Sequence, residues 1–239
     1  MHTGIKRFPM NQLGRDFAVG DIHGAFTRLQ KTLDSVKFDP QTDRLFSVGD
    51  LTDRGPESEQ ALNWLEQPWF HSIQGNHELM VIWGAQGKPM QYADHAHHGG
   101  AWFYNLPAIE QAKYKKTFEQ MPLIIEVETS NGLVGLVHAD FPYDDWALIN
   151  PHKISHDDTL FCQWSRERYN LQYQAPIRNI RAVIHGHTPI MKMITLGNCY
   201  FIDTGGWTNE SQGHFTLLEL GTLTPHFGPK NAQLVYLNA

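Results

Sequence analysis

Cysteine is scarce in this sequence, which excludes a fold held together by a disulfide framework. Only Cys162 and Cys199 occur among the 239 residues. Because two cysteines so far apart suit a reducing compartment, we expect both to be small core residues of a cytoplasmic protein. Long apolar runs are also absent: none approaches the roughly 20 residues of a membrane span, and residues 1–15 lack the apolar centre of a signal peptide. We therefore expect no membrane partner.

Basic residues are few as well. The chain has 19 Lys and Arg against 25 Asp and Glu, and its formal net charge is −6. Since proteins usually bind a nucleic-acid backbone through a basic patch, this balance argues against DNA or RNA as a partner. Hydrophobic residues at 41% and charged residues at 18% are typical of a globular fold. The length predicts one domain over residues 1–239.

The first third of the chain repeats one pattern, in which a short apolar run is followed by a polar loop and then by apolar residues at helical spacing. The elements expected from it are strands at 17–19, 45–48 and 70–73 and helices at 26–36, 61–65 and 77–83. Strands that alternate with helices in this way predict βαβ units and parallel strand pairs.

The later part of the chain is rich in predicted strands. Residues 84–107 lack periodicity and predict a surface excursion or a small helical insert, and a helix is expected at 108–121. An Asn131-Gly132 turn between two apolar runs predicts a hairpin of strands 123–129 and 133–137. Further strands are expected at 182–184, 191–196, 200–202 and 215–220. These elements favour a mixed α/β sandwich over a doubly wound sheet.

Polar side chains of the kinds that bind metals follow five of the predicted strands. Histidine, the commonest ligand of transition metals, occurs 14 times. Loops at the carboxyl ends of strands can converge on one point, and independent turns have no reason to carry such residues every time. The residues at these ends are Asp21, His23, Asp50, Asp53, Arg54, Asn76, His77, Glu78, His138, His185 and His187.

This mixture of carboxylate, imidazole and amide groups predicts a metal centre. It suits Mn, Fe or Zn better than Ca or Mg alone. One ion cannot hold the six candidate ligands comfortably, whereas two ions about 3.5–4 Å apart can share a carboxylate. Asp50, in the middle of the order, is the natural bridge.

Five motifs in this order resemble the signatures of the phosphoprotein phosphatase branch of the metallophosphoesterases. They are Gly20-Asp21-Ile22-His23-Gly24, Gly49-Asp50-Leu51-Thr52-Asp53-Arg54-Gly55, Gly75-Asn76-His77-Glu78, Val137-His138-Ala139-Asp140 and Gly186-His187-Thr188-Pro189. Segments between them, such as Trp164-Ser165-Arg166-Glu167-Arg168 and Ile202-Asp203-Thr204-Gly205, are similar to the group of the bacteriophage lambda-type serine/threonine protein phosphatase and its bacterial relatives. The resemblance covers residues 16–220 and implies a calcineurin-like β-sandwich of mixed sheets flanked by helices.

The resemblance also implies a role for each site residue. One ion would be held by Asp21, His23 and Asp50, and a second by Asp50, Asn76, His138 and His187. His77 would be the general acid, oriented by Asp53, while Arg54 and Arg166 would bind the phosphate. We expect two divalent transition ions per chain, with Mn as the first choice and Fe or Zn as alternatives.

The activity implied is hydrolysis of phosphoserine and phosphothreonine monoesters in phosphoprotein substrates, through direct attack by a hydroxide that bridges the two ions. A first alternative is a dinucleoside polyphosphate or other nucleotide phosphohydrolase on the same metal core. A second is a non-catalytic metal-binding module, against which the proton donor and the two arginines argue.

Two groups of histidines match no ligand position of the resemblance. We interpret His185 as a neighbouring structural residue, and the cluster of His95, His97 and His98 as part of a solvated loop near the cleft rather than a third metal site. The sequence does not specify the oligomeric state.

Overall fold

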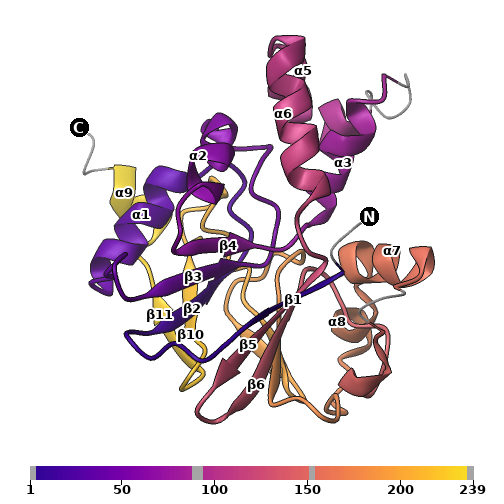
Figure 1. Cartoon of the computed structure of the whole chain (residues 1–239). Helices are drawn as coiled ribbons and strands as arrows, with labels where there is room; N and C mark the ends of the chain where they lie inside the picture. Colours follow the sequence, from indigo (N-terminus) through magenta and orange to yellow (C-terminus); the bar gives the residue numbers. More distant parts are fainter. Residues whose placement is uncertain (1–3, 88–93, 151–153, 236–239) are drawn as a thin grey trace.

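The computed structural model describes residues 4–87, 94–150 and 154–235, which form two β-sheets packed face to face (Figure 1). One sheet has the order β11 (Thr224–Phe227), β10 (Thr216–Glu219), β2 (Asp16–Val19), β3 (Arg44–Ser47) and β4 (Phe70–Ser72). The other has the order β1 (Ile5–Phe8), β5 (Ile124–Thr129), β6 (Gly132–Val137), β7 (Ala182–His185), β9 (Cys199–Phe201) and β8 (Ile194–Leu196). Both sheets are mixed, because each contains parallel and antiparallel pairs.

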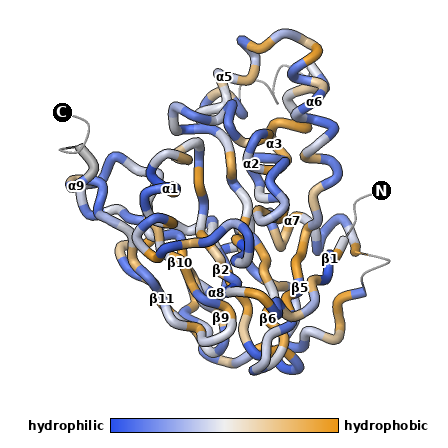
Figure 2. The backbone as a smooth tube through the Cα atoms, turned by 60° about the vertical axis from the view of Figure 1, so that its left-hand side comes forward, coloured by the Kyte–Doolittle hydropathy of each residue, from blue (hydrophilic) through white to orange (hydrophobic). Residues whose placement is uncertain are grey.

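Apolar side chains fill the space between the two sheets. Ala18, Phe46 and Val48 come from the first sheet and its loops, Ile125 and Leu136 come from the second, and all are fully buried. Figure 2 shows the hydrophobic colour gathered on the central strands, whereas the peripheral loops are mostly hydrophilic. Burial of these side chains is the main favourable contribution to holding the sheets together.

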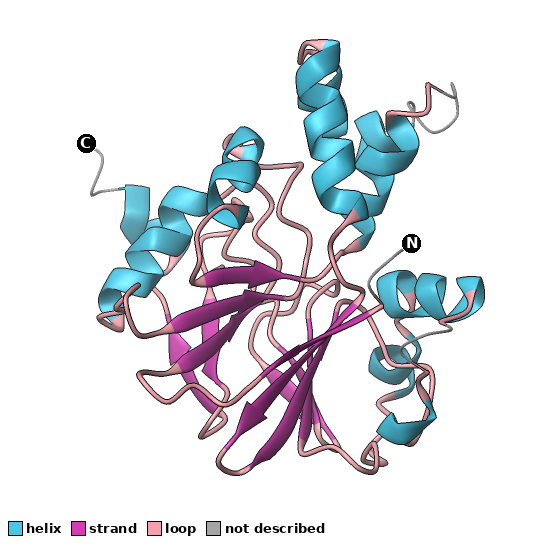
Figure 3. Ribbon diagram, viewed as in Figure 1, coloured by secondary structure: helices cyan, strands magenta, loops and turns pink. Residues whose placement is uncertain are grey.

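Helices cover the outer face of each sheet (Figure 3). Helix α1 (Phe26–Ser35) buries Phe26, Leu29 and Leu33, whose spacing places them on one helical face toward the first sheet. The other sheet packs through Val183 and Phe201 against residues such as Cys162 of α7 (His156–Trp164). The remaining helical elements are η1 (Ser58–Gln60), α2 (Ala61–Leu65), α3 (Asn76–Gly84), η2 (Ala96–Gly100), α5 (Ala101–Tyr104), α6 (Ala108–Glu119), η3 (Trp146–Leu148), α8 (Glu167–Leu171) and α9 (Asn231–Val235). Among the described residues, no helix combines the length and apolar composition needed to cross a bilayer.

The predicted mixed α/β sandwich is confirmed, as are the three strand–helix units and the hairpin. The position of the hairpin turn was wrong, because Thr129 pairs with Gly132 and the turn residues are therefore 130 and 131. Gly132 has the positive φ of 120° there, so the glycine ends the turn rather than occupying its centre. The strand expected at 191–196 is shorter: only Ile194–Leu196 pair, and Met191 is 79% exposed.

Candidate functional site

The carboxyl ends of strands from both sheets meet in one place. Strands β2, β3 and β4 are mutually parallel, and so are β6, β7 and β9. Two contacts join the loops of the two sheets: His138 Nδ1 lies 2.7 Å from the carbonyl oxygen of Val48, and the amide of His187 donates to Asp21 Oδ1 at 2.9 Å. The residues predicted as ligands therefore converge, and each of them is buried.

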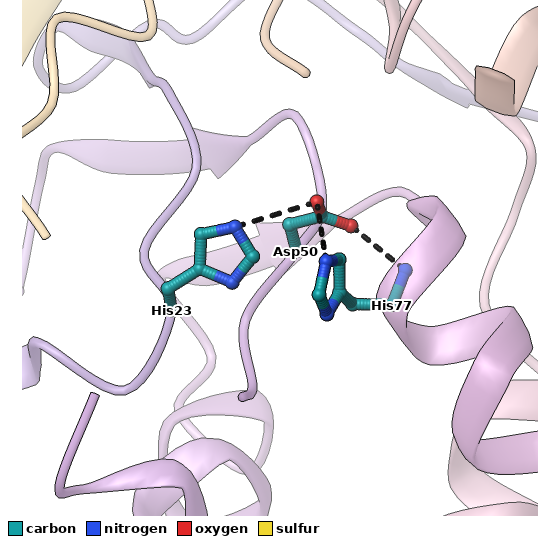
Figure 4. Close-up of side chains that lie close together, drawn as sticks. All are labelled: His23, Asp50 and His77. Carbon is teal, nitrogen blue, oxygen red and sulfur yellow. Dashed lines mark hydrogen bonds and ion pairs between the residues drawn. The ribbon is translucent and has the colours of Figure 1, made fainter. Parts of the chain in front are cut away.

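Asp50 lies at the centre of this convergence and faces different groups with its two carboxylate oxygens. Figure 4 shows His23 and His77 pointing toward it. Asp50 Oδ2 is 3.5 Å from His23 Nε2 and 3.9 Å from His77 Nε2, whereas Oδ1 is 3.4 Å from His138 Nε2. This arrangement suits a carboxylate that is shared between two ions.

The structure contains two overlapping sets of side chains that could hold ions, each with ligand atoms within 4.8 Å of one another. One set is His23, Asp50 and His77, and the other is Asp50, His138 and His187. Asp21 lies beside the first set, with Oδ2 3.9 Å from His23 Nε2. The oxygen of Asn76 lies in the second, 2.8 Å from His138 Nε2 and 3.0 Å from His187 Nδ1.

The hydrogen bonds around the histidines fix which ring nitrogens are free to bind an ion. His23 and His138 each place Nδ1 on a backbone carbonyl, which can only accept, so their Nε2 lone pairs face the site. His187 places Nε2 on the Trp164 carbonyl in the same way, which leaves its Nδ1 lone pair facing Asn76. Lone pairs, carboxylates and an amide oxygen thus converge, and the guanidinium of Arg54, with Nη1 3.0 Å from His23 Nε2, is a donor beside them. Such a set fits cations.

Burial favours the uncharged form of these imidazoles. It lowers the pKa of His23, His138 and His187 below the usual value for histidine. Burial acts to raise the pKa of Asp50, but the surrounding histidines, His138 first, outweigh it and hold that pKa well below its usual range. The uncharged imidazole is the form of histidine that binds a metal ion.

The loops that carry these residues have an unusual backbone conformation. Positive φ angles, which L-residues rarely adopt, occur at His23 (45°), Asp50 (52°), Asp53 (73°), Arg54 (65°) and His187 (63°). Two glycines leave space for the carboxylates of the site. A Cβ at Gly75 would lie 2.3 Å from Asp50 Oδ1, and one at Gly186 would lie 2.1 Å from Asp21 Oδ1. Strained backbone of this kind typically occurs at functional sites.

Glu78 supports the loop that presents Asp50. Its fully buried carboxylate accepts hydrogen bonds from the amides of Asp50 (2.9 Å), Leu51 (2.8 Å) and Gly75 (2.8 Å). Burial and the nearby charge of Asp50 raise the pKa of Glu78 to about 7. Glu78 therefore holds the metal-binding loop in place without pointing into the site.

Replacing Glu78 with Gln is expected to lower the free energy of unfolding by about 1–3 kcal/mol, the cost of leaving a buried donor unsatisfied. A glutamine has one acceptor oxygen, so at least one of the three amide donors would face its NH₂ group instead. Urea unfolding of the metal-free protein measures the loss. Glu128→Gln, at an exposed position, is the control; equal stability of both variants would contradict this role for Glu78.

His77 is paired with Asp53 beside the metal-binding set. The distance from His77 Nδ1 to Asp53 Oδ2 is 2.6 Å, and both side chains are fully buried. Burial acts to lower the pKa of His77, but the charge of Asp50 and the hydrogen bond to Asp53 outweigh it and raise that pKa. Nε2 has no hydrogen-bond partner within the described part of the chain and points at Asp50. This geometry suits a proton donor, and it equally allows His77 to act as a ligand.

Two exposed guanidinium groups flank the site. Arg54 Nη1 lies 3.0 Å from His23 Nε2, and its guanidinium stacks over the ring of Trp207 at 4.7 Å. Arg166, at the start of α8, donates to the His187 carbonyl at 3.2 Å. They therefore reach the two ends of the metal-binding set, where an anion in the site would lie between them.

The structure agrees with one of the two interpretations made for the remaining histidines and contradicts the other. His185 ends β7 with Nδ1 on the Val137 carbonyl and its ring stacked on Phe201, in keeping with a structural role. The interpretation of His95 as part of a solvated loop was wrong, because it is fully buried against Asp53, whereas His97 is exposed. Its hydrogen bond with the Tyr104 hydroxyl at 3.0 Å and its tight packing on Gly100 explain this burial.

Asp203 is a site residue that the sequence prediction did not include. It follows β9, is 1% exposed, and accepts hydrogen bonds from the Gly205 amide and the Trp207 indole. Burial raises its pKa to about 6, and its charge acts in turn on Asp21. The rule that polar residues after strands converge would have found it, since it follows a sixth predicted strand, at 200–202.

Comparisons with known proteins agree with this geometry. The calcineurin-like phosphoesterase family matches residues 17–191. The chain is 35% identical to serine/threonine-protein phosphatase 1 of Salmonella typhimurium over 79% of its own length and 85% of that protein. It is 41% identical to a symmetrical bis(5'-nucleosyl)-tetraphosphatase of Dechloromonas aromatica, but over only 30% of its length and 26% of that protein.

Among solved structures, a protein provisionally assigned as a diadenosine tetraphosphatase superposes with a TM-score of 0.66 at 19% identity, covering 95% of this chain and 98% of the other. This likeness concerns the fold alone. The match over residues 17–191 and the 35% identity to a bacterial relative along most of both chains show that the chain belongs to the calcineurin-like phosphoesterase family.

Proposed function

We propose that this protein is a metal-dependent phosphoprotein phosphatase that hydrolyses phosphoserine and phosphothreonine monoesters. The observation that carries the proposal is the buried His77–Asp53 pair beside the set of metal ligands, with 2.6 Å between Nδ1 and Oδ2. An alkoxide of serine or threonine leaves poorly without a proton, and this pair can deliver one. The similarity to a bacterial serine/threonine-protein phosphatase along most of the chain supports this substrate class.

The ligand sets proposed are those that the resemblance implies. Asp21, His23 and Asp50 would hold one ion, and Asp50, Asn76, His138 and His187 the other. When bound, a pair of divalent ions would supply Lewis acidity and make hydroxide available at neutral pH. We propose Mn as the native ion, with Fe or Zn as alternatives, because the donors mix nitrogen and oxygen without thiolate.

The chain's own residues would bind the phosphoryl group and move a proton. Arg54 and Arg166 would donate charge-assisted hydrogen bonds to the phosphoryl oxygens from the two ends of the site. As the bond between phosphorus and the substrate oxygen breaks, His77 Nε2 would give its proton to that oxygen. Asp53 would hold the imidazole through Nδ1 and stabilise its protonated form. No covalent bond to the protein is required.

The alternative is hydrolysis of a dinucleoside polyphosphate, which the 41% identity to a symmetrical bis(5'-nucleosyl)-tetraphosphatase over 30% of the chain supports. The two functions separate in one experiment, in which a phosphothreonine peptide, para-nitrophenyl phosphate and diadenosine tetraphosphate are offered to the Mn-loaded protein. We expect the highest kcat/KM with the peptide. A higher kcat/KM for the dinucleotide would replace the proposed function with the alternative.

We also propose that the described elements form a single catalytic domain that works in the cytoplasm. One apolar cluster joins both sheets, which supports the first part. Cys162 and Cys199 are buried and unpaired, and free thiols of this kind persist in a reducing compartment.

A further inference from the structure

The carboxylate of Asp53 accepts hydrogen bonds from more side chains than the His77–Asp53 pair requires. Besides His77, it contacts the Nε2 of His95, at 3.0 Å from Oδ2 and 3.2 Å from Oδ1. The indole nitrogen of Trp102 donates to Oδ1 at 2.6 Å. His95 and Trp102 come from the segment before α6, far in the sequence from Asp53. Neither residue belongs to a family motif quoted above or has a role in the proposed reaction.

His95 is held as a donor by its own surroundings. A carboxylate only accepts, so Nε2 carries the hydrogen that points at Asp53, and Nδ1 can then accept from the hydroxyl of Tyr104 at 3.0 Å. The ring sits where a Cβ on Gly100 would lie 2.1 Å from it, and a Cβ on Gly84 would lie 2.0 Å from the Tyr104 hydroxyl. Two glycines thus leave room for the chain of contacts from Tyr104 through His95 to Asp53.

Trp102 reaches the other oxygen of Asp53 from α5. Its ring packs against Tyr114 of α6, with ring centroids 5.2 Å apart, and the Tyr114 hydroxyl donates to the Glu59 carbonyl at 2.8 Å. The indole is therefore held by its packing on Tyr114 and by its hydrogen bond to Asp53. Its donor lies on Oδ1, while His77 contacts Oδ2 and His95 lies within hydrogen-bond distance of both oxygens.

Three donors constrain a carboxylate in a way that one cannot. With His77 alone, the Asp53 carboxylate could rotate about its last side-chain bond and still keep one hydrogen bond. With donors on both oxygens the plane of the carboxylate is fixed, and with it the direction in which the His77 ring points. The same three bonds satisfy a side chain with no exposure to solvent, whose burial would otherwise be unfavourable.

We propose that His95 and Trp102 are positioning residues for proton donation by His77, acting through the Asp53 carboxylate. This inference rests on the proposed function, because it needs His77 to be the proton donor. Residues 95–102 would then contribute to the reaction, although none of them is a proposed metal ligand. A histidine with a merely structural role would affect stability but not the choice between leaving groups.

Two variants remove one donor each while keeping most of the side-chain volume: His95→Met and Trp102→Phe. With a phosphothreonine peptide, each should lower kcat about 10-fold, a part of the roughly 10²–10⁴-fold effect of general acid catalysis. With para-nitrophenyl phosphate, whose leaving group needs less protonation, the loss should be under about 3-fold. KM and the content of two ions per chain should not change.

His95→Gln is the conservative variant, because its amide can again donate to Asp53, and it should recover most of the peptide activity. His97→Gln, at the exposed neighbouring histidine, is the matched control and should behave as wild type. In an Asp53→Ala background, His95→Met should cause no further loss, since the residue through which it acts is absent.

Several outcomes would overturn the inference. Equal losses on both substrates, an undiminished effect of His95→Met in the Asp53→Ala background, or wild-type kinetics in both donor variants would each do so. If one variant fails to fold, the other decides. A wild-type protein that hydrolyses neither substrate when loaded with Mn, Fe or Zn would instead contradict the proposed function, and the inference would fall with it.

Discussion

Replacement of His77 by Asn is expected to slow hydrolysis of a phosphothreonine peptide by about 10²–10⁴-fold, the usual contribution of a general acid. Asparagine can keep the hydrogen bond to Asp53 in place of Nδ1, but it has nothing in place of Nε2, the atom that points at Asp50. The loss should be much smaller with para-nitrophenyl phosphate, because nitrophenolate leaves readily without a proton. Steady-state kinetics on the two substrates measure the difference.

Metal analysis of the same variant decides between the two roles that the geometry allows. His77 Nε2 lies within reach of a set formed with His23 and Asp50, so it could be a ligand. Retention of two ions with a leaving-group-dependent loss supports the acid. Loss of an ion would reassign His77 as a ligand, and equal losses on both substrates with both ions present would count against acid catalysis. His156→Asn, at an exposed histidine, is the control.

Removal of the metal ions should have an even larger effect on activity. We expect purified protein to bind two divalent transition ions per chain and to lose all measurable turnover on chelation, with recovery when Mn is returned. Asp50→Asn should reduce kcat/KM by more than the roughly 10–100-fold that loss of an outer partner of a metal ligand costs, because Asp50 faces both ligand sets. Ion content by mass spectrometry and turnover are measured on the same samples.

A control variant tests whether loss of ions and activity is specific to the metal-binding residues. Asp157→Asn, at an exposed position of α7, should leave both ion content and turnover unchanged. Activity that persists in protein shown to be free of metal would contradict the whole assignment of the site. Recovery with Zn or Fe but not with Mn would leave the site in place and change only the native ion.

Much of the site could be predicted from the sequence because its residues directly follow strands. In βαβ units, parallel strands end at the same edge of a sheet, so Asp50 after β3 and Asn76 after β4 must lie near each other. The same reasoning placed His138 and His187 together. Strand patterns alone do not predict that the two sheets meet at this edge. The structure shows it through the contact between His138 Nδ1 and the Val48 carbonyl oxygen.

The residues that the sequence did not predict lie where periodicity is weak. His95 and Trp102 belong to a stretch of π-helix and short α-helix, with Gly99 at a φ of 96°, so no regular spacing indicates which side chains turn inward. Strand β1 is a short edge strand in which Lys6 and Arg7 are exposed, and it has almost no apolar pattern.

The two proposed ions would not contribute equally to the cohesion of the molecule. The ligands of the first, Asp21, His23 and Asp50, all follow strands of one sheet, so this ion would organise loops within a single layer. The ligands of the second come from both layers, since Asn76 follows β4 while His138 and His187 follow β6 and β7. The second ion would therefore hold the two sheets together at this edge of the sandwich. Titrating metal into stripped protein should therefore raise the melting temperature mainly in one of its two binding steps.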